Sequence, residues 1–310
     1  MRIVFMGTPD FAASHLEALL ESNYNVVGVF SQPDRPKGRG RKLTPTPVKL
    51  VSLKYGIPVF QPDSVNTGDG FDTLCKLSPD VIMTVAYGKL LKKRVIELPS
   101  LGCYNVHASL LPRYRGAAPI QRTLENGETE TGITIFKIDE GMDSGPIAVA
   151  ESIEIEMSDS FGTLFEKLQT LGRKMLLNFA ASLDNRNPFL TPQSDEEASF
   201  APKILPDDLL LKDFSSATRV FNKIRAFDPA PGVRTSLGGE IVKLFGARPG
   251  AEETIGIDGE IVEIDDSGMV VSCGSGSVII SLVQFSGKKK MHPVDALSGR
   301  LLGKGMVLGG

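Results

Sequence analysis

The first half of the chain alternates short apolar runs with stretches in which apolar residues recur at helical spacing. The apolar runs predict strands over residues 2–6, 25–30, 57–60, 81–86, 103–107 and 131–138. The helical spacing predicts helices over residues 11–21, 47–54, 92–98, 119–126 and 160–183. Strands that alternate with helices are typical of a parallel sheet covered on both faces. We therefore predict an α/β fold with a Rossmann-like, parallel-sheet domain over residues 1–183.

The pattern changes after residue 183. Residues 184–206 are rich in Pro, Asn, Ser and acidic residues. Their apolar residues follow neither the helical nor the strand spacing over enough length for a helix or a strand, which predicts a linker. One helix is predicted near residues 217–226, and short strands separated by glycine-containing turns follow it. Closely spaced hairpins of this kind predict a small, OB-like β-barrel domain over residues 207–310. Two domains also fit a length of 310 residues, because one domain takes roughly 150.

Charge and cysteine usage argue against several classes of protein. The formal net charge of −3 disfavours a protein that coats nucleic acid indiscriminately, although a local basic patch can still bind RNA. The three cysteines, Cys75, Cys103 and Cys273, lie far apart without CxxC spacing, which disfavours a disulfide framework and a thiolate zinc site. Since the first residues contain no long apolar stretch, we expect a cytoplasmic protein without a membrane span.

The turn after the first predicted strand argues against a nicotinamide enzyme. Its sequence, Gly7-Thr8-Pro9-Asp10-Phe11, contains a single glycine. The dinucleotide fingerprint needs a second glycine, because the backbone must approach the pyrophosphate closely. A dehydrogenase is therefore the weaker alternative for this fold.

Asn105 and His107 are the first candidates for chemistry. They lie two residues apart at the carboxyl end of a predicted strand, so their side chains share one face, about 6–7 Å apart. Open α/β sheets bind their ligands at this edge. An amide beside an imidazole can stabilise the oxyanion that forms when a nucleophile attacks a carbonyl carbon. On spacing alone, a purely structural pair at the end of a strand is the alternative.

Asp143 is the second candidate, and it lies downstream of the next predicted strand. The loop around it, Asp139-Glu140-Gly141-Met142-Asp143-Ser144-Gly145-Pro146, contains glycines and a proline that can place a carboxylate tightly. A carboxylate there can orient an imidazole or take a proton from an incoming ammonium group. Without a partner, an aspartate that only forms a turn is the alternative.

Three motifs in this region belong together. They are Asn-x-His-x-Ser-Leu-Leu-Pro at residues 105–112, Arg-Gly-Ala-Ala-Pro at 115–119 and Asp-x-Gly-x-Asp-x-Gly at 139–145. The set resembles the signature of the 10-formyltetrahydrofolate-dependent formyltransferases, and the resemblance covers essentially the whole chain, including residues 7–11, 32–40 and 85–88. It implies a catalytic triplet and a folate-binding segment. The triplet is Asn105, His107 and Asp143, and the segment is Ser109, Leu110, Leu111 and Pro112.

The resemblance also implies the reaction. A free amine attacks the formyl carbon of 10-formyltetrahydrofolate, Asn105 and His107 stabilise the tetrahedral oxyanion, and tetrahydrofolate leaves. Asp143 keeps His107 oriented and helps the attacking nitrogen to lose its proton. No metal is implied. His15 and His292 show no metal-ligand spacing, and we expect them to be structural or solvated.

Two basic segments indicate that the acceptor amine is carried on RNA. One is a glycine-containing loop, and the other lies in the predicted barrel, a fold that often binds nucleic acid. The cations are Arg35, Lys37, Arg39, Arg41 and Lys42 in the loop, and Lys288, Lys289 and Lys290 in the barrel. Together with these segments, the resemblance implies that the acceptor is the amino group of methionine on initiator tRNA, and we expect no obligate protein partner. The alternatives are a solvated basic loop and lysines that protect a strand edge.

Two other functions fit the same sequence features. A formyltransferase or formyl hydrolase of the same fold could act on a small amine or on water. A catalytically silent RNA-binding protein could also use this scaffold. The intact set of Asn105, His107 and Asp143 disfavours the silent protein.

Overall fold

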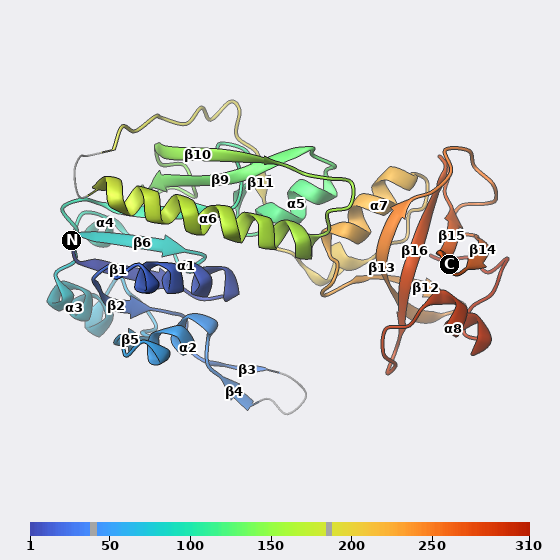
Figure 1. Ribbon diagram of the computed structural model, residues 1–310, viewed down its shortest axis with the longest axis horizontal. Helices are drawn as coiled ribbons and strands as arrows, with labels where there is room; N and C mark the ends of the chain where they lie inside the picture. The colour runs from blue at the N-terminus through green and yellow to red at the C-terminus, as the bar shows by residue number, and fades with distance from the viewer. Residues whose placement is uncertain (38–41, 184–187) are drawn as a thin grey trace. The chain divides into compact units, whose positions relative to one another are not determined.

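The computed structural model describes residues 1–37, 42–183 and 188–310 (Figure 1). Backbone contacts group the chain into two compact units. The first consists of Met1–Ala117, Thr131–Ile153 and Lys167–Ala201, and the second of Ala118–Glu130, Glu154–Glu166 and Pro202–Gly310. The chain thus passes back and forth between the units. The sequence pattern carries no sign of this exchange, because it suggests one division around residues 184–206.

The first unit is built on a seven-stranded sheet with the order β10-β9-β7-β6-β1-β2-β5. Its strands are β1 (Ile3–Gly7), β2 (Val26–Phe30), β5 (Val59–Phe60), β6 (Val81–Val85), β7 (Cys103–His107), β9 (Glu130–Lys137) and β10 (Ile147–Glu154). Neighbours from β5 to β7 are parallel, whereas β9 is antiparallel to β7. Numbered along the chain, the parallel strands have the order 3-2-1-4-5, which is the Rossmann arrangement. The predicted α/β class is confirmed.

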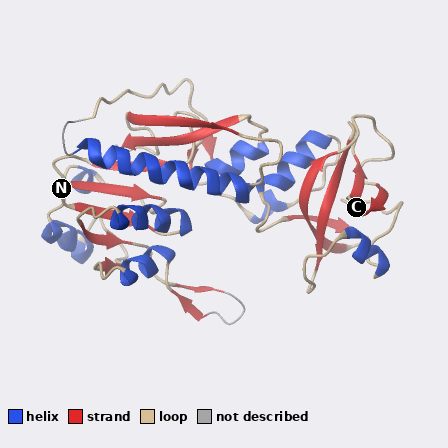
Figure 2. Ribbon diagram, viewed as in Figure 1, coloured by secondary structure: helices blue, strands red, loops and turns tan. Residues whose placement is uncertain are grey.

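Helices alternate with these strands, as the apolar spacing predicts (Figure 2). They are α1 (Asp10–Glu21), α2 (Pro47–Lys54), α3 (Gly68–Leu77), α4 (Lys93–Ile96) and α6 (Phe161–Leu183). α2 begins where the Thr46 hydroxyl accepts a hydrogen bond of 3.2 Å from the Lys49 N–H and Pro47 occupies the first turn. Every residue of β1 and β6 is buried, as expected for parallel strands covered on both faces.

The sequence pattern missed several elements of this unit. α3 contains Gly68 and Gly70, which lower its helix propensity. Gly70 is required there, because an added Cβ would lie 2.1 Å from the Ser64 carbonyl oxygen. β10 is not predicted although it begins with an apolar run, Ile147 to Ala150, and none of its residues is buried. Two strand pairs, β3 (Arg35–Lys37) with β4 (Lys42–Thr44) and β8 (Arg115–Gly116) with β11 (Phe200–Ala201), are too short to show a period.

The second unit contains a five-stranded antiparallel sheet with the order β12-β13-β16-β15-β14. The strands are β12 (Val233–Leu237), β13 (Glu240–Pro249), β14 (Ile261–Asp265), β15 (Gly268–Ser272) and β16 (Ser277–Phe285). The end of the chain joins the two outer strands, because Leu308 bridges to Leu237 and Val307 bridges to Glu260, just before β14. The sheet therefore closes into the small barrel that the hairpins predicted.

Helices complete the second unit. They are α5 (Pro119–Glu125), the 3₁₀ turn η1 (Pro206–Leu209), α7 (Ala217–Ala226) and α8 (Pro293–Ser298). Arg122 of α5 donates to Glu125 and to Asp208 of η1, with both distances at 2.8 Å. Asn222 of α7 lies against Gly127, where an added Cβ would be 2.6 Å from its amide nitrogen. These contacts explain why residues around α5 group with the C-terminal part of the chain.

Candidate active site

Asn105 and His107 lie at the carboxyl end of β7, as the sequence predicts. Asn105 is half-buried, and the side chain of His107 is 7% exposed. β6 is the parallel neighbour of β7 and β1 is the next strand, so the carboxyl ends of all three strands share one edge of the sheet. The edge next to the first strand of a Rossmann sheet is its usual ligand-binding position.

The side-chain amide of Asn105 is held in one orientation by Thr84. The two residues are directly paired across β6 and β7, and the Thr84 hydroxyl donates a hydrogen bond of 2.6 Å to Asn105 Oδ1. Because the amide oxygen is occupied by this bond, the Nδ2 group is the end that remains to donate. Asn105 can therefore present an N–H donor to a developing oxyanion.

His107 is oriented by a backbone carbonyl. Its Nε2 lies 2.9 Å from the carbonyl oxygen of Tyr114, and a carbonyl can only accept, so Nε2 carries the proton. Nδ1 then faces Asp143, with 3.7 Å between Nδ1 and Oδ2. This separation is longer than a hydrogen bond. The ring position is thus set by Tyr114, and Asp143 acts on it through charge.

The loop that carries Asp143 explains the spacing of its motif. Asp143 adopts the left-handed conformation, with φ of 52°, and its Oδ2 accepts a hydrogen bond of 2.8 Å from the Gly116 N–H. Asp139 Oδ1 accepts hydrogen bonds of 3.0 Å from the Gly141 N–H and the Ser144 hydroxyl. At Gly145 an added Cβ would lie 1.8 Å from the Lys137 carbonyl oxygen, so only glycine fits. The loop is therefore built to hold one carboxylate close to His107.

The predicted folate segment, residues 109–112, follows directly after β7. Ser109 is fully buried, and its hydroxyl donates to the Arg113 carbonyl at 2.7 Å. Thr134 of β9 fixes the segment from the other side, since its hydroxyl donates to the Ser109 carbonyl and accepts from the Leu111 N–H. Leu111 is buried, whereas Leu110 and Pro112 are half-buried. The Ser109 hydroxyl thus holds the backbone in place, and folate binding by this segment stays a prediction.

The predicted basic residues fall on two surfaces. Arg35, Lys37 and Lys42 belong to the β3–β4 hairpin, which projects beside α2 in Figure 1, and Arg35 and Lys42 are exposed. Arg39 and Arg41 lie outside the described residues. Lys288, Lys289 and Lys290 follow β16 and are exposed. Lys290 is already engaged, because its ammonium lies 3.5 Å from the centroid of the Phe245 ring and donates to the Pro229 carbonyl at 2.8 Å.

Three residues that support the site are not indicated by the sequence pattern: Thr84, Tyr114 and Gln193. Thr84 could have been found only from the register of β6 against β7. Tyr114 acts through its carbonyl, which no residue type reveals. Gln193 lies in the segment predicted as a linker, yet its amide donates to the carbonyl oxygens of Asp143 and Gly145.

The remaining histidines and cysteines take no part in this cluster. His15 is fully buried on α1 with its Nδ1 2.7 Å from the Phe11 carbonyl, and His292 accepts a hydrogen bond of 3.3 Å from the Val294 N–H at the start of α8. Burial raises the pKa of the Cys103 thiol to about 12, which disfavours a thiolate. Among residues 1–37, 42–183 and 188–310, no group of three or more His, Cys, Asp or Glu side chains is arranged to hold a metal.

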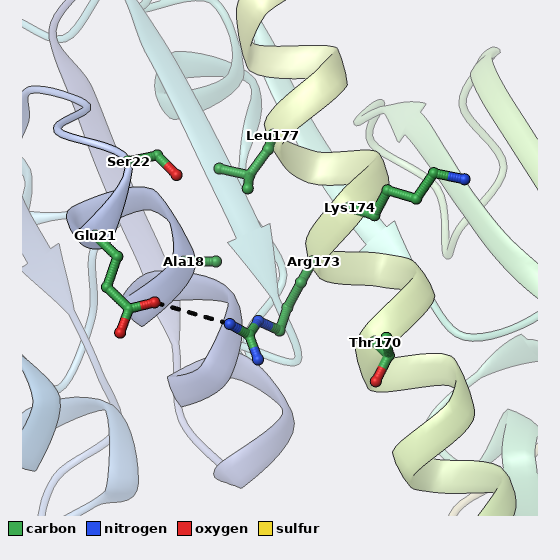
Figure 3. Close-up of a pocket in the computed structure, with 7 residues that line it drawn as sticks. All are labelled: Ala18, Glu21, Ser22, Thr170, Arg173, Lys174 and Leu177. Atoms are coloured by element: carbon green, nitrogen blue, oxygen red, sulfur yellow. Dashed lines mark ion pairs between the residues drawn. The ribbon is translucent and has the colours of Figure 1, made fainter.

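A pocket in the first unit lies elsewhere, between α1 and α6 (Figure 3). Arg173 points across it toward Glu21, with 3.8 Å between Nη2 and Oε2. The lining residues are Ala18, Glu21, Ser22, Thr170, Arg173, Lys174 and Leu177. They include none of the candidate catalytic or binding residues. The candidate active site is therefore defined by the cluster of Asn105, His107 and Asp143, and this pocket is separate from it. None of the described helices is long and apolar enough to cross a membrane.

The fold and the cluster at the end of β7 can be compared with known proteins. The family model "Formyl transferase" matches residues 1–179, and the model "Formyl transferase, C-terminal domain" matches residues 204–301. The chain belongs to the formyl transferase family, which confirms the family resemblance of its motifs.

Particular relatives carry a more specific name. Methionyl-tRNA formyltransferase of Kosmotoga olearia is 62% identical over 313 residues, which cover 100% of both chains. Methionyl-tRNA formyltransferase of Thermotoga maritima is 47% identical over 307 residues, which cover 99% of this chain and 97% of the relative.

Solved structures share the fold at low identity. A sugar 3N-formyl transferase, WlaRD, in the presence of dTDP and 5-N-formyl-THF superposes with a TM-score of 0.68 at 19% identity. The match covers 93% of this chain and 99% of that one. HypX from Aquifex aeolicus in complex with tetrahydrofolic acid has a TM-score of 0.66 at 18% identity, covering 98% of this chain and 48% of HypX.

Proposed function

We propose that this protein transfers the formyl group of 10-formyltetrahydrofolate to the amino group of methionine on initiator tRNA. The products are N-formylmethionyl-tRNA for translation initiation and tetrahydrofolate. The observation that carries the proposal is the 62% identity, over the full length of both chains, with a methionyl-tRNA formyltransferase. The arrangement of Asn105, His107 and Asp143 at the end of β7 supports it, because these groups suit acyl transfer.

The formyl carbon is attacked by the free methionyl amine. As the new C–N bond forms, the carbonyl oxygen becomes an oxyanion, and Asn105 Nδ2 donates a hydrogen bond to it. Thr84 supports this role, since its bond to Asn105 Oδ1 leaves Nδ2 as the donating end.

The attacking nitrogen must lose a proton, and N10 of the folate must gain one when the bond from N10 to the formyl carbon breaks. His107 Nδ1 can accept a proton, because Nε2–H is already donated to Tyr114. The carboxylate of Asp143, 3.7 Å away, stabilises the resulting imidazolium. The same proton can then pass to the departing nitrogen. Residues 109–112, held beside His107 by Thr134, are the proposed folate-binding segment.

The acceptor stem of the tRNA is proposed to meet the basic residues. Arg35, Lys37, Arg39, Arg41 and Lys42 form one group, and Lys288 and Lys289 form another, with Lys290 contributing less because its ammonium already binds Phe245 and Pro229. We expect an enzyme with this substrate to act in the cytoplasm.

Transfer to a small amine or to water is the competing function. The similarity to WlaRD is a similarity of fold alone, because the sequences are only 19% identical. It therefore does not favour a small amine as the acceptor. One assay separates the functions. The protein is incubated with 10-formyltetrahydrofolate and, in parallel, with methionyl-initiator tRNA, methionyl-elongator tRNA, free methionine, an amino sugar, or no acceptor.

We expect N-formylmethionyl-tRNA to form with the initiator tRNA much faster than with the elongator tRNA. Without an acceptor, release of tetrahydrofolate should be slow. Release at the same rate with and without acceptor would identify a hydrolase. Formylation of the amino sugar, with none of the tRNA, would identify a small-amine enzyme.

A further inference from the structure

Gln193 links two parts of the first unit that are far apart in sequence. It lies in the segment 188–201, downstream of α6, and its side chain reaches the loop that carries Asp143. We propose that Gln193 is a positioning residue, which holds Asp143 in place for proton transfer. The proposal rests on the function proposed above.

The side-chain amide of Gln193 is fully used. Nε2 donates a hydrogen bond of 2.9 Å to the Asp143 carbonyl and one of 2.7 Å to the Gly145 carbonyl, and Oε1 accepts one of 3.0 Å from Arg115 Nε. Since a guanidinium can only donate, Arg115 fixes the amide with its oxygen toward Arg115 and its NH₂ group toward the loop. Gln193 therefore acts in one orientation only.

Arg115 is itself well anchored. It is 5% exposed, its Nη1 lies 2.8 Å from Asp195 Oδ1, and its backbone N–H donates to the Ser199 carbonyl at 2.9 Å. Its neighbours in sequence support the site directly: the Tyr114 carbonyl accepts from His107, and the Gly116 N–H donates to Asp143. Residues 114–116, Gln193 and Ser199 thus form one framework around His107 and Asp143.

The Asp143 loop requires such a clamp. Asp143 is a non-glycine residue with a positive φ of 52°, a conformation that persists only where the surrounding contacts impose it. Two contacts do so: Gly116 holds the carboxylate, and Gln193 holds the carbonyl of the same residue. If Gln193 is lost, we expect the carboxylate to leave the Gly116 N–H and to lose its fixed distance from His107.

The test compares Gln193→Met with Asp195→Asn. Methionine keeps the length and volume of glutamine but makes none of its three hydrogen bonds. Asp195 is in the same segment and pairs with the same arginine, but its side chain is 86% exposed, and none of the hydrogen bonds described for it reaches the loop. We expect Gln193→Met to lower kcat for formyl transfer by about 10- to 100-fold, because a displacement of about 1 Å has an effect of this size. KM for 10-formyltetrahydrofolate should stay within about twofold, and Asp195→Asn should keep wild-type kcat.

Three readouts separate a positioning role from a structural one. The thermal midpoints of the two variants should lie close together, and a crystal structure of Gln193→Met should show Asp143 Oδ2 beyond hydrogen-bonding distance of the Gly116 nitrogen. Gln193→Glu should also lose rate, because a carboxylate keeps the bond to Arg115 but places oxygen against the Asp143 and Gly145 carbonyls.

Wild-type kcat in Gln193→Met, or an unchanged Asp143 in its crystal structure, overturns the positioning role. An equal loss of rate in Asp195→Asn also overturns it. The rate would then depend on the general integrity of the segment and not on the hydrogen bonds of Gln193 to the Asp143 loop. The wild-type assay with initiator tRNA reports separately on the proposed function. The crystal structure decides the role of Gln193 even if that assay fails.

Discussion

Thr84 donates a hydrogen bond of 2.6 Å to the side-chain oxygen of Asn105, and the two residues are direct partners across β6 and β7. The bond selects one of the two orientations of the amide, and in that orientation Nδ2 is the group that remains to donate to a ligand. A residue of the sheet thus sets the direction of the proposed oxyanion donor. The Thr84 side chain makes no other hydrogen bond among those described for residues 1–37, 42–183 and 188–310.

Removal of this hydroxyl should lower turnover without affecting folate binding. In Thr84→Val the shape is kept but the amide oxygen loses its donor, so the amide can rotate and present oxygen to the oxyanion. We expect kcat to fall roughly tenfold. This loss is smaller than the loss from removing an oxyanion donor altogether, because the Asn105 amide is still present and adopts the donating orientation part of the time. Thr84→Ser keeps the hydroxyl and should stay near wild-type activity. Steady-state kinetics on the three proteins check this, and equal rates in Val and Ser variants would contradict it.

The catalytic assignments themselves have a larger expected effect. Asn105→Ala should keep the fold but lose about 10²–10³ in rate, the usual consequence of removing one oxyanion donor. His107→Ala should also keep the fold but lose about 10²–10⁴ in rate, the usual contribution of a general acid–base group. Single-turnover rates with saturating folate measure the chemical step directly. Circular dichroism of each variant confirms that it is folded. A folded variant that transfers formyl at nearly the wild-type rate would show that the residue has another role.

Much of the fold of the first unit can be predicted from the sequence, because its strands and helices are marked by local patterns of residues. β7 and α2 begin and end at the predicted residues, since a short apolar run and a threonine cap before a proline are visible in the chain itself. The supports of the site are not local. Thr84 reaches Asn105 across 21 residues, and Gln193 reaches Asp143 across 50, from a segment without any period. Such contacts depend on strand register and loop path, which composition and spacing do not encode.

His15 predicts how stability depends on pH. Burial lowers the pKa of its imidazole from the ordinary value of 6.5 to about 4, and its Nε2 has no hydrogen-bond partner among the described residues. Because the folded pKa is lower than the unfolded one, the neutral ring favours the folded state above pH 6.5. This contribution, about 3 kcal/mol at most, is lost as pH falls from 6.5 toward 4.

Urea denaturation at pH 7 and pH 5 measures this loss. In His15→Gln the decrease between the two pH values should be smaller than in the wild type, because the titrating group is gone. The variant should also be less stable at pH 7, since it loses the ring contact with Phe11, whose centroid lies 4.6 Å away. An equal decrease in both proteins would assign the acid sensitivity to other groups.

The basic loop distinguishes a tRNA enzyme from a small-amine enzyme, and its test uses two matched double variants. Arg39→Ala with Arg41→Ala removes two charges, whereas Arg39→Lys with Arg41→Lys keeps them. If both arginines bind phosphate, each contributes roughly −0.7 to −0.9 to the slope of log affinity against log salt. The alanine pair should therefore weaken binding of charged tRNA and flatten the slope, with folate binding nearly unchanged.

The lysine pair decides what kind of contact the loop makes. A lysine still binds phosphate as a point charge, so the salt slope should stay close to that of the wild type. A guanidinium can in addition bind two acceptors at once in a fixed plane, which lysine cannot do. If Arg39 reads the acceptor stem, the lysine pair should keep its affinity but lose part of its preference for initiator over elongator tRNA. If both pairs instead retain the wild-type slope and preference, the loop is only a solvated cationic tip, and recognition of tRNA would have to rest on Lys288 and Lys289 of the barrel.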